Sequence, residues 1–374
     1  MISIMSVIEM MKISILIRVL IFVILLQGLI NGDDTATSTV AINISVDPRV
    51  ELMSIIYRLA GKKEYHQPTV QGPYVHDVDK YFSPYKEHPV IKYVVKLPDR
   101  CGFDKPMALA VHLADAYTLK ERIPFKPIPE GLANSWGGAG LGNARKIVEK
   151  ARSFVHDTRF KEFIEEHQSL YKQTEARMKD LLYREGHFQW YENFFGPRPR
   201  SSFHLVLCML NGGCCYAATY VQGNSEEIYC FLGIWLYDQD QMPGFDRSVF
   251  TSVVHEFSHS YVNPLVHDHY VELGKAGKRL YSGVKDQMKR MQYGGWHYMI
   301  QESIVRACEI RYLKKTQGLE AAQDKISQEI GKGFLWMQEL SNLFDEYENN
   351  RDTYPTFASF FPRIIRFFHD YCGK

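Results

Sequence analysis

One stretch, SVVHEFSHSYVNP from Ser252 to Pro264, constrains the fold more than any other part of the chain. Apolar side chains recur in and just before it with the period of a helix, which predicts a face buried in the core. The residues of this face are Phe250, Val253, Val254, Phe257 and Tyr261. The same helix carries His255, Glu256 and His259, so a buried element has to accommodate three ionisable side chains.

Two changes of hydrophobic period divide the rest of the chain. Helical patterns predominate from Asp47, which fits an N-cap, to about residue 194. After Pro199 come three runs rich in β-branched and aromatic residues, separated by the turn-forming segments 211–213 and 223–224. Helical periodicity then returns and continues to the C-terminus. This order predicts an α+β protein with a helical N-terminal part, a small antiparallel sheet, the His-Glu helix and further C-terminal helices.

The N-terminal segment differs in kind from the remainder. Lys12 and Arg18 precede an unbroken apolar run from Val19 to Leu26, and polar residues follow it. This is the pattern of an export signal, and the run is too short to span a bilayer. We therefore expect residues 1–32 to be a signal peptide or N-terminal anchor, and the protein to be periplasmic, cell-surface or secreted. Only an uncleaved segment of this kind would bring the chain to a membrane.

The composition bears on two questions, whether the chain binds nucleic acid and whether its cysteines form disulfides. Lys and Arg (44) nearly cancel Asp and Glu (43), which gives no electrostatic reason to favour nucleic acid. The seven cysteines form no Cys-x-x-Cys motif, so they predict buried free thiols rather than a zinc ribbon or a disulfide scaffold.

We divide the chain after its N-terminal segment into a mainly helical region, 33–200, and a catalytic region, 201–374, which together could form one compact unit.

The spacing of the two histidines suits a metal ion. Residues four apart on a helix are separated by about 40° of rotation and about 6 Å of rise, so His255 and His259 can bind one ion through neutral imidazoles. Glu256 lies about 100° round from His255, beside the ion and not on it. A general base that takes a proton from a metal-bound water belongs there. The alternative is that ordinary hydrogen bonds satisfy these histidines.

The third protein ligand has to come from elsewhere, because Pro264 disfavours helical geometry before it and predicts that the helix ends by Asn263. Val262 and Leu265 exclude the elongated motif that continues with a glycine and a third histidine. The remaining candidates are Glu302, Glu309, His267, His269, Asp268 and His297. We choose Glu302, because the segment around it has helical periodicity and would offer it from a second packed helix.

At these residues the chain resembles the gluzincin metallopeptidases, the group that includes thermolysin-like enzymes and aminopeptidase N. His255, Glu256 and His259 match the paired-histidine motif, and Glu302 matches the downstream glutamate ligand. The resemblance implies a zincin-like fold, a bound Zn²⁺ ion and hydrolysis of a peptide or protein substrate.

A second resemblance covers most of the chain after the N-terminal segment. The stretches ISVDPRVELMSIIYRLAG, VDKYFSPYKEHP and HEFSHSYVNP are similar to a bacterial family of exported proteins of unknown function that are presumed metallopeptidases. Two features depart from the gluzincin pattern. Arg306 stands where thermolysin-like enzymes have an acidic residue, and the Met-Glu-Asn loop of aminopeptidase N has no counterpart.

The implied mechanism needs further groups around the metal. Tyr298, His297 and Tyr281 are candidates to stabilise the oxyanion, and we choose Tyr298. Zincin-like folds set a strand beside the metal to pair with substrate, and the last strand before the metal helix offers Phe231, Leu232 and Gly233 for this role. The alternative is a central strand whose glycine relieves packing.

Two rival hypotheses remain at this stage. The first is an exported binding protein for peptide or carbohydrate, in which the His-Glu helix holds no catalytic metal. The second keeps the zinc but gives it a structural role, with a fourth protein ligand such as His267 or a cysteine.

Overall fold

The strand runs assemble into a four-stranded sheet with two long central members. Its strands are β1 (Ile42–Ser45), β2 (Ser201–Cys208), β3 (Cys215–Gln222) and β4 (Ser225–Gly233). Their order is β1-β2-β4-β3; β1, β2 and β4 are mutually parallel and β3 is antiparallel to β4. A separate antiparallel pair joins β5 (Leu236–Tyr237) and β6 (Pro243–Gly244). β4 is buried from Ile228 to Gly233 because it has neighbours on both sides.

The computed structural model describes residues 41–373 except 103, 127–131 and 138–139. The described residues from 41 onward belong to one compact unit, so the described parts of the 33–200 and 201–374 regions form one body. The expected export segment, 1–32, lies outside the described residues. All seven cysteines lie within them and are free thiols, four of them buried. No helix among the described residues has the length and hydrophobicity needed to cross a membrane.

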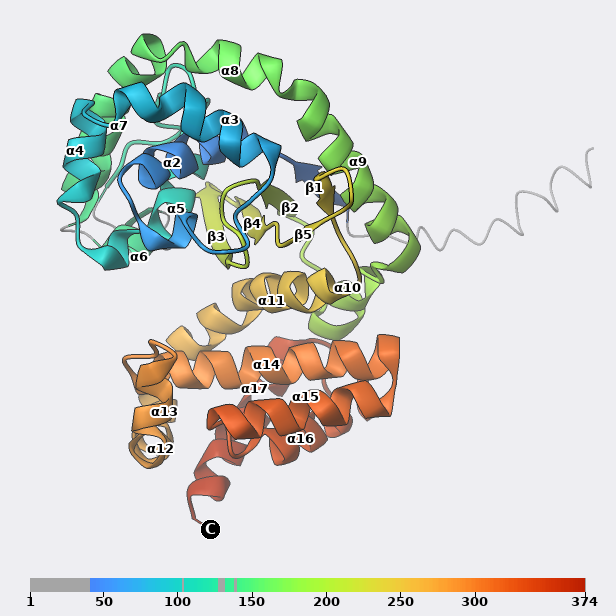
Figure 1. The fold of residues 1–374 in the computed structure, drawn as a ribbon. Coiled ribbons are helices and arrows are strands. Elements are labelled where there is room, and N and C mark those ends of the chain that lie inside the picture. The colour runs from blue at the N-terminus through green and yellow to red at the C-terminus, as the bar shows by residue number, and fades with distance from the viewer. Residues whose placement is uncertain (1–40, 103, 127–131, 138–139, 374) are drawn as a thin grey trace, which may run out of the picture. The chain divides into compact units, whose positions relative to one another are not determined.

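Helices precede and follow the strands β2–β6 in the chain (Figure 1). The N-terminal helices are α2 (Pro48–Leu59), α3 (Pro73–Phe82), α4 (Pro89–Val95), α5 (Lys105–Val111), α6 (Leu132–Trp136), α7 (Leu141–Asp157), α8 (Phe160–Glu166), α9 (Gln168–Glu185) and α10 (Gln189–Phe195). The C-terminal helices are α11 (Ser248–Asp268), α12 (Tyr270–Gly283), α13 (Lys285–Arg290), α14 (Trp296–Gln317), α15 (Leu319–Lys332), α16 (Met337–Asn349) and α17 (Phe357–Cys372). The predicted α+β class is confirmed.

The connection after β2 differs from the predicted hairpin. The turn at Gly223 joins β3 and β4 as an antiparallel hairpin, as expected. The segment 211–213 does not close a second hairpin, because the chain leaves β2, passes the position of β4 and returns through β3 at the edge. β2 and β4 are therefore parallel neighbours, and the sheet is mixed. Parallel strands need both faces covered, which explains their nearly continuous apolar sequences.

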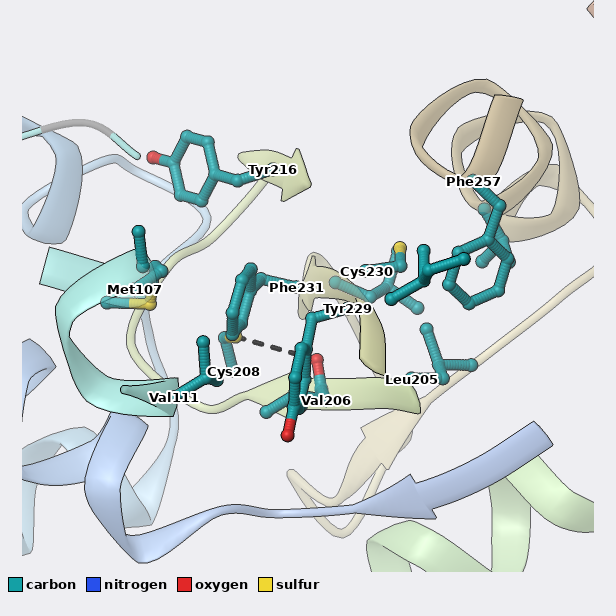
Figure 2. Packing of buried hydrophobic residues seen from close by; sticks show 14 of the residues in the cluster. Met107, Val111, Leu205, Val206, Cys208, Tyr216, Tyr229, Cys230, Phe231 and Phe257 are labelled. Atoms are coloured by element: carbon teal, nitrogen blue, oxygen red, sulfur yellow. Dashed lines mark hydrogen bonds between the residues drawn. The ribbon is translucent and has the colours of Figure 1, made fainter. Parts of the chain in front are cut away.

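The two faces of the sheet carry different helices (Figure 2). Leu205 and Cys230 face Phe257 of α11, whose ring also packs at 5.1 Å from that of Phe203. On the other side, α5 contributes Met107 and Val111. Alternation of side chains along β2 and β4 sends successive residues to opposite faces. The apolar face predicted for the His-Glu helix is thus the face that fixes α11 on the sheet.

α11 continues past the expected end at Asn263 and includes Pro264. A proline inside a helix leaves the carbonyl four residues earlier without its N–H partner. Here that carbonyl belongs to Ser260, and the Arg198 guanidinium donates to it at 3.0 Å. Arg198 also pairs with Glu226 and lies over the Tyr261 ring at 4.7 Å. A side chain from outside the helix therefore replaces the missing backbone donor.

We expect Arg198→Met to lower the free energy of unfolding by at least about 1–2 kcal/mol, since it leaves the Ser260 carbonyl without a donor. Pro264→Ala restores a backbone N–H to that carbonyl. In a double-mutant cycle measured by urea unfolding, Arg198→Met should lower the free energy of unfolding by less in the Pro264→Ala background than in the native chain. Arg198→Met removes the Glu226 ion pair in both backgrounds. An equal loss of unfolding free energy in the two backgrounds would therefore contradict this account.

A buried carboxyl lies in the N-terminal part of the core. Glu51 of α2 is fully buried, and its two oxygens accept hydrogen bonds from the Tyr74 hydroxyl (2.7 Å) and the Met209 backbone N–H (3.1 Å). Burial raises the pKa of Glu51 to about 7. The folded chain therefore retains a proton on Glu51 at pH values where the unfolded chain has lost it.

This difference predicts a dependence of stability on pH. The stabilisation is complete below about pH 4, where both states are protonated, and is lost as the pH rises to about 7. Glu51→Gln does not titrate, so its stability relative to the native chain should improve by about 3 kcal/mol between pH 4.5 and pH 8. Urea unfolding at the two pH values measures this change. An unchanged difference would show that Glu51 ionises normally in the folded chain.

Candidate metal centre

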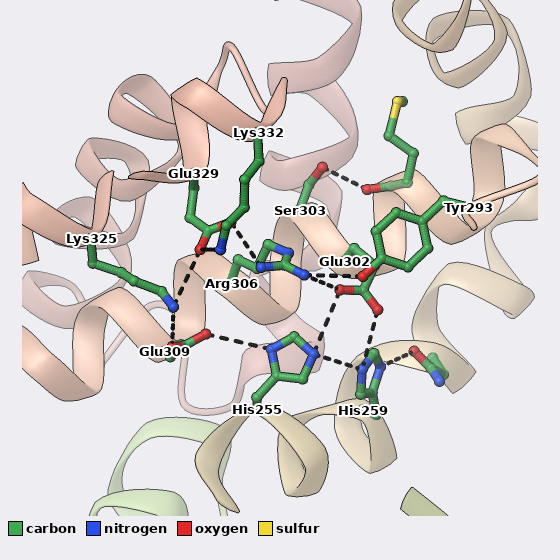
Figure 3. Close-up of polar contacts among 12 residues, drawn as sticks. His255, His259, Tyr293, Glu302, Ser303, Arg306, Glu309, Lys325, Glu329 and Lys332 are labelled. Atoms are coloured by element: carbon green, nitrogen blue, oxygen red, sulfur yellow. Dashed lines mark hydrogen bonds and ion pairs between the residues drawn. The ribbon is translucent and has the colours of Figure 1, made fainter. Parts of the chain in front are cut away.

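Two packed helices, α11 and α14, bring together His255, His259 and Glu302 (Figure 3). The Nε2 atoms of the two histidines are 3.2 Å apart. Nε2 of His255 lies 3.5 Å from Glu302 Oε2, and Nε2 of His259 lies 3.5 Å from Glu302 Oε1. The structure thus joins the three residues predicted as ligands, and the group could hold a metal ion.

Each imidazole is oriented by an oxygen on its far side. His255 Nδ1 lies 3.4 Å from Glu309 Oε2, and His259 Nδ1 lies 3.2 Å from Asn263 Oδ1. If each Nδ1 carries the proton and donates to its oxygen, both Nε2 atoms present lone pairs. Those lone pairs and the Glu302 carboxylate then point at one another, an arrangement that could hold a cation between them.

The spacing of these atoms fits such an ion. Nitrogen and oxygen ligands lie about 2.0–2.1 Å from zinc in tetrahedral sites, which places neighbouring ligand atoms about 3.3 Å apart. The observed separations of 3.2 to 3.5 Å agree with that geometry. Burial opposes the protonation of His255, but Glu302 and Glu309 outweigh it and raise the pKa of this imidazole above its usual value. Burial lowers the pKa of His259 to about 4.

Glu256 is the partly exposed carboxyl beside this group, and no hydrogen bond or ion pair joins its side chain to the described part of the chain. Burial raises its pKa to about 7, with the Glu302 charge adding to the effect and His255 opposing it. A group that serves as a base at neutral pH needs a pKa in this range. Glu256 therefore has both the freedom and the basicity that proton transfer requires.

Among the other candidates for the third ligand, Glu309 lies behind His255, and the rest are outside the group. Among the residues that the structure describes, the group contains His255, His259 and Glu302 alone. His269 pairs with Glu272 at 3.1 Å and stacks on Phe361. The other unused candidates are His267, Asp268 and His297. Within the described residues, the group thus offers three protein ligands to an ion.

The acidic partner of a ligand histidine occupies an unexpected position. Arg306, four residues after Glu302, donates to Glu302 Oε2 at 3.0 Å. Glu309, seven residues after Glu302, orients His255 instead. Burial opposes its ionisation, but hydrogen bonds from His255 and Lys325 lower the pKa of Glu309 to about 2. Helical spacing alone could have found Glu309, because residues seven apart share a face.

A hydroxyl that contacts Glu302 belongs to Tyr293. Tyr293 accepts a hydrogen bond from Arg306 at 3.0 Å and is hydrogen-bonded to Glu302. Tyr298 is 51% exposed, its ring packs on His297, and its hydroxyl has no hydrogen bond within the described residues. Tyr293 precedes α14 in an irregular connection, where no periodic pattern could single it out. The Tyr281 hydroxyl donates to the Tyr293 carbonyl.

The prediction that β4 pairs with the substrate backbone is wrong. Phe231 and Leu232 lie in β4, whose backbone is paired with β2 on one side and β3 on the other. A Cβ on Gly233 would lie 2.0 Å from the Gly212 carbonyl oxygen, so this glycine allows a close approach of the backbone, as the alternative proposed. The sheet has two edge strands, β1 and β3, and β3, which begins at Cys215, contacts α11.

We expect Glu309→Gln to weaken the binding of a divalent ion by about 10- to 100-fold, because a neutral amide holds the His255 imidazole less well. Competition between the chain and a chromophoric chelator for Co²⁺ measures the affinity. Glu346→Gln is the matched control, since Glu346 pairs with Arg363, away from the ligands. Equal affinities of Glu309→Gln and the native chain would refute the orienting role.

Comparisons with known proteins give a family and no activity. The family described as Domain of unknown function (DUF4932) matches residues 42–367, which include all the ligands and their partners. No curated protein and no solved structure matches the chain. The match covers most of the sequence, and the chain therefore belongs to the DUF4932 family.

Proposed function

We propose that the chain is a zinc-dependent peptidase. One observation carries the proposal: three converging lone-pair donors lie beside a free carboxyl, Glu256, and no fourth protein ligand closes the group within the described residues. A structural zinc site normally has four protein ligands, whereas a catalytic site keeps a position for water. The resemblance of His255, Glu256, His259 and Glu302 to the gluzincin motif supports the same function.

The residues divide the chemistry among them. A bound zinc ion would bring the pKa of a coordinated water to about 7 and polarise a peptide carbonyl. Glu256 takes a proton from the attacking water and delivers it to the leaving amine, which requires a carboxyl that titrates near neutral pH. His255, His259 and Glu302 would hold the ion. Glu309 and Asn263 keep the two imidazoles in the orientation that binding needs.

The fold offers a place for an extended substrate. β3 is an edge strand and lies next to α11, so its outer backbone groups are available to pair with a peptide. We propose a peptide or protein substrate on this ground. The proposed location is outside the cytoplasm, because the segment 1–32 has the sequence features of an export signal. The balanced net charge gives no support for a nucleic-acid substrate.

The experiment measures metal content and peptide hydrolysis on the same full-length preparations. The native chain should contain about one zinc ion by mass spectrometry, as expected for a single three-ligand catalytic site, and should release free amines from casein. His259→Ala should lose both the zinc and the activity. Glu256→Gln should keep the zinc and lose about 10²- to 10⁴-fold in rate, since it removes the general base.

Two results would contradict the proposal. One is a native chain that contains no zinc even after reconstitution. The other is a Glu256→Gln variant that hydrolyses casein at the native rate. Glu346→Gln serves as the matched control for glutamate substitution, because its carboxylate pairs with Arg363 on the α16–α17 side of the fold.

A further inference from the structure

A carboxylate on α15 lies at the centre of the charged residues behind the proposed metal ligands. Glu329 is fully buried, and its oxygens contact three cations: Arg306 at 2.8 Å, Lys325 at 3.2 Å and Lys332 at 2.8 Å. Burial opposes the ionisation of Glu329, but these cations lower its pKa below the usual value. It therefore stays charged in the core.

Two of the three cations lead on to the proposed metal centre. Arg306 uses one nitrogen for Glu329 and another for Glu302 Oε2, at 3.0 Å. Lys325 contacts Glu329 and also Glu309, at 2.6 Å. Glu309 in turn holds His255 Nδ1, and Glu302 faces His255 Nε2. These contacts close a ring of side chains that runs through His255 (Figure 3).

The ring explains how the outer partners of the ligands hold their positions. Glu302, Arg306 and Glu309 come from one face of α14, where the two glutamates have the same charge and Arg306 lies between them in sequence. Buried charges are stable only when each has a fixed partner of opposite sign. Glu329 supplies that partner to both cations from a separate helix. Without it, Arg306 and Lys325 would have no anion to hold them on the side away from the ligands.

We propose that Glu329 is a positioning residue for the metal centre: through Arg306 it fixes the Glu302 carboxylate, and through Lys325 it fixes the Glu309 carboxylate that orients His255. The inference rests on the proposed function for the identity of the ligands. It assigns to α15 a role that neither the His-Glu-x-x-His motif nor the downstream glutamate indicates.

Lys332 offers a matched control for the test. It contacts the same oxygen of Glu329 as Lys325 does, but it leads to neither Glu302 nor Glu309 and is 43% exposed. We therefore compare Glu329→Gln with Lys332→Met in the full-length, metal-free protein. The probe is Co²⁺, whose affinity is measured by chelator competition and whose coordination is reported by its visible absorption spectrum. Thermal unfolding of each metal-free variant reports the stability of the fold separately.

Glu329→Gln should bind Co²⁺ about tenfold more weakly and with an altered spectrum, because an amide cannot hold both cations. Lys332→Met should match the native chain in both readouts. Native binding by Glu329→Gln would overturn the inference, as would an equal loss in Lys332→Met. If Glu329→Gln does not fold, Lys325→Gln takes its place: it should weaken binding, and Lys325→Arg should restore it.

The outcomes also separate this inference from the proposed function. A native chain that binds Co²⁺ through His255 and His259, with Glu329→Gln equal to it, would overturn the role of Glu329 alone. A native chain that binds no Co²⁺ would overturn the proposed function and the positioning role together.

Discussion

The close packing of α11 against α14 places ionisable side chains where they are largely shielded from water, and much of the C-terminal half is arranged around that constraint. His255, His259 and Glu302 meet within 4.8 Å of one another. Each is held from behind by a group of suitable charge or polarity, and two of those groups, Glu309 and Arg306, are held in turn by residues of α15. A buried charge without such partners would cost several kcal/mol, so the centre and its supports have to form together.

α11 connects this centre to the sheet. One face of the helix packs through Phe257 on Leu205 and Cys230 (Figure 2), and another face presents the histidines to Glu302 of α14 (Figure 3). The position of the histidines relative to β3 is therefore set by apolar packing, while their orientation is set by hydrogen bonds. Different side chains of α11 therefore contact the sheet and form the candidate metal site.

The sequence was sufficient for features that depend on local periodicity. Helical spacing identified His255, His259 and Glu302, and composition identified the strand runs and the turn at Gly223. It failed where distant segments decide the outcome. β4 lies in the middle of the sheet, and Arg198 from a distant segment supports α11 where it continues through Pro264. Glu329, on another helix, contacts Arg306 beside the candidate metal site. None of these contacts leaves a periodic signal in the chain.

The central claim is that His255, His259 and Glu302 bind one ion and leave a position for water. X-ray absorption at the zinc edge of the purified full-length protein tests it most directly. The account predicts two imidazole nitrogens and carboxylate and water oxygens at about 2.0–2.2 Å, with four-coordinate geometry. A spectrum with a sulfur ligand at about 2.3 Å, or with imidazoles in excess of two, would contradict the account.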